Sequence, residues 1–153
     1  MPVVRRSRTV DAPAEQVWEV VSDPYHMPRW WPEVKRVESV EDDRFTQVFT
    51  TRKGRSVRMD FRLLASEPPE PGGERPGRRT WEQELAGTPF ERVLAAAVTE
   101  VVVEPAGERT RVTIALTQKL RGMSRTGGLF LRRATRTRVD RALSGLDEVV
   151  SGS

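Results

Sequence analysis

Apolar and polar side chains alternate along several stretches of this chain, and a period of two predicts β-strands. The clearest alternation lies in residues 57–65, where Val57, Met59, Phe61 and Leu63 fall on one face and charged or polar residues on the other. Because successive strand side chains point to opposite faces, this stretch predicts a strand with one buried face.

Similar patterns, separated by turn residues, predict further strands before and after this one. The predicted strands cover residues 3–10, 34–40, 45–52, 57–65, 79–86, 91–104 and 111–120. Residues 67–77 are rich in proline and glycine, which predicts a surface loop. Short turns, such as Glu41-Asp42-Asp43 and Lys53-Gly54-Arg55, separate the consecutive strands between residues 34 and 66.

The period changes to that of a helix after residue 12. Pro13 suits the first helical position, and Val17, Trp18 and Val21 recur at helical spacing. The Asp-Pro pair at 23–24 predicts the end of this helix near Ser22, because the residue before proline avoids the α region. The same pair predicts a second, short helix with the aspartate as its cap.

Residues 123–150 predict a helix about 42 Å long, at 1.5 Å per residue. Val139, Leu143, Leu146 and Val150 form one apolar stripe along it, which must pack against another element. The predicted order is β-α-α-β6-α, an α+β arrangement. A chain of 153 residues fits a single domain, so we expect one domain over residues 1–153.

The amino-acid composition excludes some kinds of functional site. The chain has no cysteine and one histidine, which excludes thiolate chemistry and a His-rich metal site. We expect no metal and no cofactor. There is also no apolar h-region at the start and no apolar run of about 18 residues, so we expect no membrane span and a cytoplasmic location.

The net charge of +4 and the 23 arginines among 26 basic residues leave acidic partners open. Most basic residues alternate with acidic or polar ones, however, and the arginines of the last helix surround it instead of forming one face. We therefore do not expect nucleic acid as a partner.

Three segments carry a resemblance to a known family. They are the run VDAPAEQVWEVVSD at residues 10–23, the run MPRWWP at 27–32 and the run TRVTI at 110–114. With the order of elements, they resemble the START-like (SRPBCC) superfamily, in its bacterial polyketide cyclase/dehydrase-type branch. The resemblance implies the helix-grip fold, a curved antiparallel sheet of six or seven strands around a long C-terminal helix that encloses an apolar cavity.

If the resemblance holds, the terminal helix covers part of the sheet and the remaining inward side chains line a ligand cavity. The candidate ligand-binding residues are Trp30, Trp31, Phe49, Met59, Phe61, Leu63, Trp81, Leu85, Val101, Ile114, Leu116, Arg132 and Val139. For each apolar member the alternative is plain core. Trp30 and Trp31 point roughly 100° apart on a helix, so one can enter the core while the other faces the rim.

Toward the start of the last helix, the apolar stripe is predicted to continue from Val139 through three basic residues, Arg136, Arg132 and Arg125. A guanidinium at the cavity mouth would pair with a carboxylate or polarise a ketone or phenolate oxygen of a ligand. The alternative is that these stems cover apolar surface while their heads reach water. Arg132 lies nearest the centre of the stripe.

Two functions remain open. The first is a module that binds a small, mostly apolar ligand, which is aromatic, acyl or polyketide-like. The alternative is a polyketide aromatase/cyclase-dehydratase that acts on a poly-β-ketone. The candidate catalytic residues are His26, Tyr25 and Arg132, with Asp60 predicted to face outward. This shortage of proton acceptors and donors favours binding over catalysis. The sequence leaves the ligand and the oligomeric state open.

Overall fold

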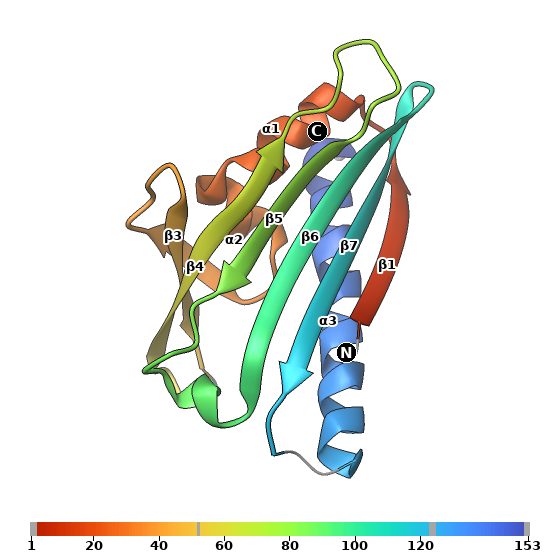
Figure 1. Cartoon of the computed structure of the whole chain (residues 1–153). Helices are drawn as coiled ribbons and strands as arrows, with labels where there is room; N and C mark the ends of the chain where they lie inside the picture. Colours follow the sequence, from red (N-terminus) through yellow and green to blue (C-terminus); the bar gives the residue numbers. More distant parts are fainter. Residues whose placement is uncertain (1–2, 52, 123–124, 152–153) are drawn as a thin grey trace.

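Seven antiparallel strands form one curved sheet in the order β1-β7-β6-β5-β4-β3-β2 in the computed structural model (Figure 1). The structure describes residues 3–51, 53–122 and 125–151, with the backbone alone for residues 125 and 126. The strands are β1 (Val3–Val10), β2 (Val34–Glu38), β3 (Arg44–Thr50), β4 (Ser56–Glu67), β5 (Gly77–Gln83), β6 (Leu94–Ala106) and β7 (Arg109–Leu120). The predicted α+β helix-grip architecture is confirmed.

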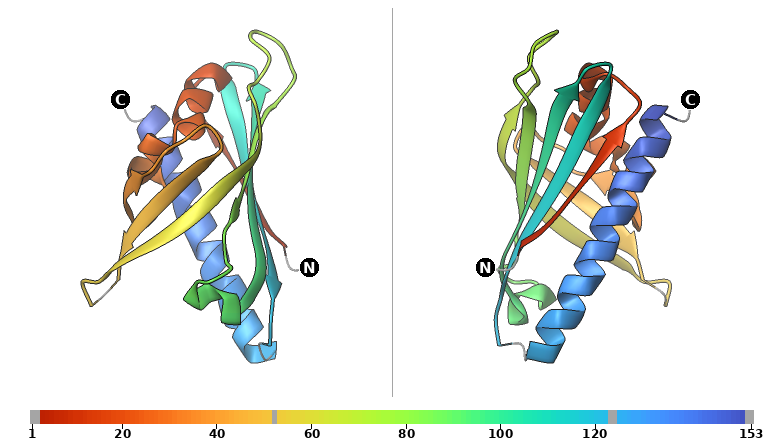
Figure 2. Two further views of the ribbon diagram at one scale, coloured as in Figure 1. Left: turned by 60° about the vertical axis from the view of Figure 1, so that its left-hand side comes forward. Right: turned by 90° about the vertical axis from the view of Figure 1, so that its right-hand side faces the viewer.

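The sheet bends where its pairing register shifts. Shifts occur between Val34 and Arg36 in β2, between Leu63 and Ala65 in β4, and at the start of β6. An extra residue on one strand bends it and increases its twist, so these irregularities help the sheet to curve. The concave side faces the long helix in both views of Figure 2.

The helices between β1 and β2 are short. They are α1 (Ala14–Ser22), the 3-10 helix η1 (Pro24–His26) and α2 (Met27–Trp30). Pro13 was predicted to be the first helical residue of α1, but it is the N-cap, because its ψ of 155° is extended. Asp23 caps η1 as predicted, and its side chain accepts a hydrogen bond from the backbone of Tyr25 at 3.0 Å.

Several predicted strand boundaries are wrong. The strands expected over 34–40, 45–52 and 79–86 end at Glu38, Thr50 and Gln83, and residue 52 lies outside the described residues. The start of β6 also differs. Glu91 and Arg92 were expected in a strand, but they belong to the 3-10 helix η2 (Pro89–Arg92). Pro89 favours a helical start because its φ is fixed near that of a first helical residue. Strand β6 begins only at Leu94.

The helix α3 (Arg125–Ser151) lies across the concave side of the sheet. The predicted start at Met123 lies outside the described residues. Its stripe of Val139, Leu143, Leu146 and Val150 is buried, as expected. Two ion pairs attach its outer flank to β1, from Arg6 Nε to Asp140 Oδ1 at 2.8 Å and from Arg8 Nε to Asp147 Oδ2 at 2.7 Å.

The apolar core fills the space between the sheet, the short helices and the C-terminal half of α3. Val17 and Val21 of α1 are fully buried there, as is Met27 of α2. The other half of α3 extends toward η2, at the opposite end of the sheet (Figure 1). None of the helices within the described ranges is long and apolar enough to span a membrane.

Candidate functional site

A pocket of about 210 Å³ lies between the concave face of the sheet and the first half of α3. From the C-cap of α2 and strands β3 to β5, it is lined by Trp31, Gln47, Phe49, Met59, Phe61, Trp81 and Gln83. From η2, strands β6 and β7 and helix α3, it is lined by Phe90, Val93, Leu94, Ala97, Thr99, Leu116, Gln118, Leu131 and Arg138. Every one of the five central strands therefore contributes to it.

The walls are mainly aromatic and aliphatic. The rings of Trp31 and Trp81 meet edge to face with centroids 6.1 Å apart, and Trp31 meets Trp30 in the same way at 5.5 Å. Phe61 stacks on Phe45 at 5.2 Å. Such contacts fix the rings relative to one another, so the pocket presents rigid aromatic edges and faces.

Four neutral polar side chains interrupt these walls, and two are held by their neighbours. Gln47, which is 1% exposed, donates from Nε2 to the Met27 sulfur at 3.1 Å. The Thr135 hydroxyl donates to Gln118 Oε1 at 3.1 Å. The Gln118 amide nitrogen therefore keeps its donors for the pocket. The other two polar residues of the wall are Gln83 and Thr99.

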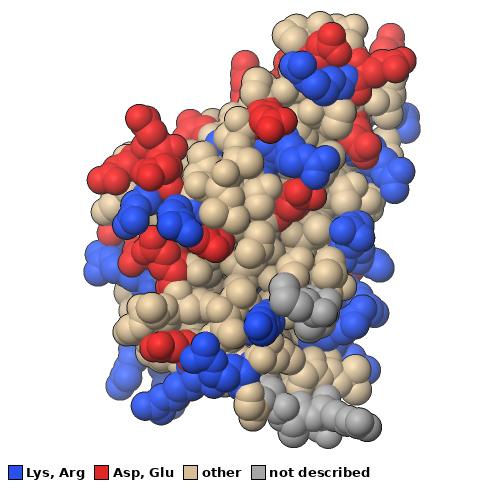
Figure 3. Space-filling model, viewed as in Figure 1, with Lys and Arg blue, Asp and Glu red and all other residues tan. Residues whose placement is uncertain are grey.

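Arg138 is the one ionisable side chain among the described residues that line this pocket. It is also exposed, which places it at the rim and not in the interior. Figure 3 shows the outer face of the sheet, on which Lys and Arg side chains predominate toward the lower end while most Asp and Glu side chains lie higher. The described lining of the pocket therefore combines neutral side chains with one cationic side chain, Arg138, at the rim.

Six of the predicted ligand contacts line the pocket: Trp31, Phe49, Met59, Phe61, Trp81 and Leu116. Trp30, Val101, Ile114 and Val139 lie in the core instead. Leu85 is buried and Leu63 is half-buried, and neither belongs to the lining. Contact of any of these residues with a ligand stays a prediction.

The expected basic continuation of the α3 stripe is wrong. Thr135, four residues before Val139, is buried, whereas Arg136 and Arg132 are exposed. A step of four residues keeps a side chain on the buried face here, and the step of three to Arg136 leaves it. Arg132 does not line the pocket but borders a hollow of about 10 Å³ that shares Gln118 and Leu131 with it. The side chain of Arg125 lies outside the described residues.

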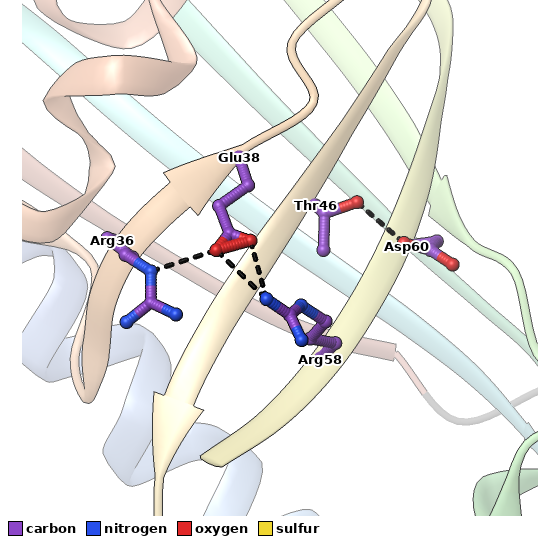
Figure 4. A network of polar contacts seen from close by, with 5 residues as sticks. All are labelled: Arg36, Glu38, Thr46, Arg58 and Asp60. Atoms are coloured by element: carbon purple, nitrogen blue, oxygen red, sulfur yellow. Dashed lines mark hydrogen bonds and ion pairs between the residues drawn. The ribbon is translucent and has the colours of Figure 1, made fainter.

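The candidate proton carriers lie away from the pocket lining. Tyr25 is 62% exposed on η1, and His26 contacts Arg29 through Nδ1 at 3.0 Å and Asp23 through Nε2 at 3.7 Å. Asp60 faces outward, as predicted, and accepts a hydrogen bond from the Thr46 hydroxyl at 2.6 Å (Figure 4). None of the three borders the pocket.

One buried charge lies at the opposite end of the concave face from the rim. Arg79 of β5 is 7% exposed and donates to the Ser66 hydroxyl at 2.8 Å. Burial lowers the pKa of the Arg79 guanidinium, and the nearby charge of Asp23 opposes that change. No group of three or more His, Cys, Asp or Glu side chains among the described residues is arranged to hold a metal ion.

Sequence reasoning missed ten lining residues, although the alternation contained part of the signal. Counting back by twos from Val101 gives Thr99 and Ala97, and counting back from Phe49 gives Gln47. Phe90 and Val93 had no such signal, because η2 and the turn after it bring them to the rim. Arg138 was missed because the phase of the α3 stripe was misplaced.

A curved antiparallel sheet, a long covering helix and an apolar pocket between them define a class of helix-grip proteins. The chain belongs to the family described as polyketide cyclase / dehydrase and lipid transport, whose model matches residues 1–151. The sequence matches none of the curated proteins.

Several solved structures share the fold. The di-domain aromatase/cyclase BexL from the BE-7585A biosynthetic pathway is 24% identical with a TM-score of 0.75, over 97% of this chain and 46% of that one. A START superfamily protein from Mycobacterium smegmatis is 14% identical with a TM-score of 0.73, over 98% and 97% of the two chains. The Zhui aromatase/cyclase from Streptomyces sp. R1128 is 19% identical with a TM-score of 0.67, over 99% and 92%. These likenesses show the fold.

Proposed function

We propose that this protein binds a small, mostly apolar ligand in the pocket between the sheet and α3. The observation that carries the proposal is the composition of the wall: rigid aromatic and aliphatic side chains with a few neutral hydrogen-bonding groups. Such a wall is typical of small-molecule sites, where apolar area supplies affinity and a few polar groups fix orientation.

The size of the pocket limits the ligand. At about 210 Å³ it lies below the range of about 300–1,000 Å³ that is usual for drug-sized molecules. The Trp31 and Trp81 rings favour a flat partner, since aromatic pairs add attraction beyond the area that they bury. We therefore propose a ligand of one or two fused rings, or an acyl chain of similar volume.

Tryptophan fluorescence tests this proposal, with 2-naphthalenemethanol as a neutral aromatic probe. The wild-type protein should bind the probe saturably. Ala97→Phe places a ring inside the pocket and should weaken binding at least tenfold, which is about 1.4 kcal/mol. Ala106→Phe, at the exposed far end of the same strand, is the matched control. Absence of binding, or equal binding by Ala97→Phe, would contradict the proposal.

A second candidate function is that of an aromatase/cyclase, which the family description and two of the similar structures favour. That reaction needs a proton acceptor and donor beside the substrate. The described pocket lining offers no carboxylate, imidazole or phenol. Incubation with a poly-β-ketone thioester, followed by mass spectrometry, should show no dehydrated cyclic product above the uncatalysed level. Such a product would favour the enzyme.

A further inference from the structure

We infer that the pocket selects ligands that carry a carboxylate, and that Arg138 with Gln118 forms the site for this group at the rim. The inference rests on the proposed function and adds to it the charge and the orientation of the ligand. It is carried by one cation that both lines the pocket and has no protein anion to pair with.

Of the described arginines that form no ion pair, Arg138 is the one that lines the pocket. Nine arginines form ion pairs with Asp or Glu side chains, including Arg141, which is one turn further along α3 and lies 4.0 Å from Glu33. Within the described part of the chain, Arg138 forms neither an ion pair nor a hydrogen bond through its side chain. Its guanidinium is therefore available to an external anion.

A second donor lies close to Arg138. Thr135 is three residues earlier on α3, and side chains at this spacing are neighbours on a helix, about 5–6 Å apart at Cβ. The Thr135 hydroxyl donates to Gln118 Oε1, which holds the Gln118 amide beside the helix with its nitrogen still able to donate. Both Arg138 and Gln118 line the pocket.

The donors at the rim and the apolar side chains beyond it together favour a ligand with one anionic end. A carboxylate accepts hydrogen bonds through two oxygens, which suits the planar guanidinium and one further amide donor. The described pocket lining contains no Asp or Glu to repel it. The interior beyond the rim is apolar and would exclude a second charge. An aromatic carboxylate fits both parts of the pocket, because its carboxylate would bind at the Arg138 rim while its ring lies toward Trp31 and Trp81.

The test compares two probes that share one ring system, 2-naphthoate and the neutral 2-naphthalenemethanol. Wild type should bind 2-naphthoate about tenfold more tightly, since charge-assisted hydrogen bonds are about twice as strong as neutral ones. The preference should fall as salt is raised, because the Arg138 end of the site is open to solvent. Arg138→Met should abolish the preference and leave the neutral probe within about twofold of its wild-type affinity.

Two further variants separate this site from general surface charge. Gln118→Glu keeps an acceptor for the Thr135 hydroxyl but places a carboxylate beside Arg138, so it should weaken 2-naphthoate more than Arg138→Met does. Arg136→Met removes an exposed charge two residues away on the same helix, outside the pocket lining, and should change neither affinity by more than about twofold.

The outcomes distinguish the two proposals. If neither probe binds wild type, the proposed function fails and the inference fails with it. If both probes bind with equal affinity, or Arg138→Met weakens both equally, the pocket binds ligands but selection of a carboxylate by Arg138 is wrong. If Arg136→Met has the effect expected of Arg138→Met, the preference comes from the overall charge of α3.

Discussion

At the scale of single residues, several arginines and carboxylates of this protein form ion pairs across the strands of the sheet. Glu38 of β2 accepts from Arg58 of β4 at 2.9 and 3.1 Å and from Arg36 at 2.9 Å (Figure 4). Arg62 pairs with Glu82 and Arg78 with Glu100 along the next strands. Arg138 forms no such pair within the described part of the chain, and it is the one arginine among the described residues that line the pocket.

The Glu38 network gives a prediction on pH. The hydrogen bond from Arg58, then that from Arg36, lowers the pKa of Glu38 below its ordinary value of 4.5. A carboxyl whose pKa is lower in the folded state stabilises that state above the ordinary value. The contribution is lost as pH falls through the lowered pKa.

Arg58→Gln should therefore raise the pKa of Glu38 toward 4.5, as measured by carboxyl carbon shifts in an NMR titration. Arg78→Gln removes a cross-strand ion pair that does not involve Glu38 and serves as the control. An unchanged Glu38 pKa in Arg58→Gln would show that the pair does not persist in solution.

At the scale of elements, α2 approaches α3 closely at Gly145. Gly145 allows this approach, because a Cβ there would lie 2.6 Å from the Trp30 carbonyl oxygen and 3.1 Å from the Trp30 Cα. These are backbone atoms, which cannot rotate away. The contact holds the C-terminal half of α3 at the short helices, while the first half extends over the pocket.

Gly145→Ala should lower the free energy of unfolding by about 1–2 kcal/mol, because overpacking against backbone outweighs the gain of about 1 kcal/mol in helix propensity. Gly128→Ala is the matched control on the same helix. Its Cβ would meet only the Leu120 Cδ1 at 3.2 Å, a flexible side-chain end. Urea unfolding should show Gly128→Ala unchanged or more stable by up to about 1 kcal/mol. Stabilisation by Gly145→Ala would contradict the contact.

At the scale of the whole molecule, one core joins the sheet to every α-helix. Buried residues of β1, α1, α2 and α3 belong to a single apolar cluster. The ion pairs of Arg6 and Arg8 join the edge strand β1 to α3, although these segments lie at opposite ends of the chain. This connectivity predicts that residues 1–153 unfold as one cooperative domain.

Leu146→Ala tests this cooperativity, since Leu146 is fully buried between α3 and the sheet. We expect a loss of about 2–5 kcal/mol of unfolding free energy. Tryptophan fluorescence and far-UV circular dichroism should shift together. Leu129→Ala removes an exposed leucine of the same helix and should stay within about 0.5 kcal/mol of wild type. Separate transitions for the two probes would indicate more than one folding unit.

The pattern of the sequence predicted the order of the elements, and the resemblance to a known family implied the helix-grip fold. Strand alternation assigned Phe49, Met59, Phe61, Trp81 and Leu116 to the inner face, because period two is a local property of an extended backbone. It could not separate pocket from core: Val101 and Ile114 share that inner face and are fully buried, yet they do not line the pocket. That distinction depends on which part of the sheet α3 covers.

The sequence by itself determined the strands, the long helix, the absence of cysteine chemistry and the arginine-rich charge. The tertiary structure decided which arginine reaches the pocket, because the phase of α3 is fixed by its packing and turns Thr135 inward while Arg132 and Arg136 face solvent. It also brought Phe90 and Val93 of the η2 turn to the rim, beside residues distant in the chain. Local periodicity specifies the faces of each element, but the pocket exists only where faces from several elements meet.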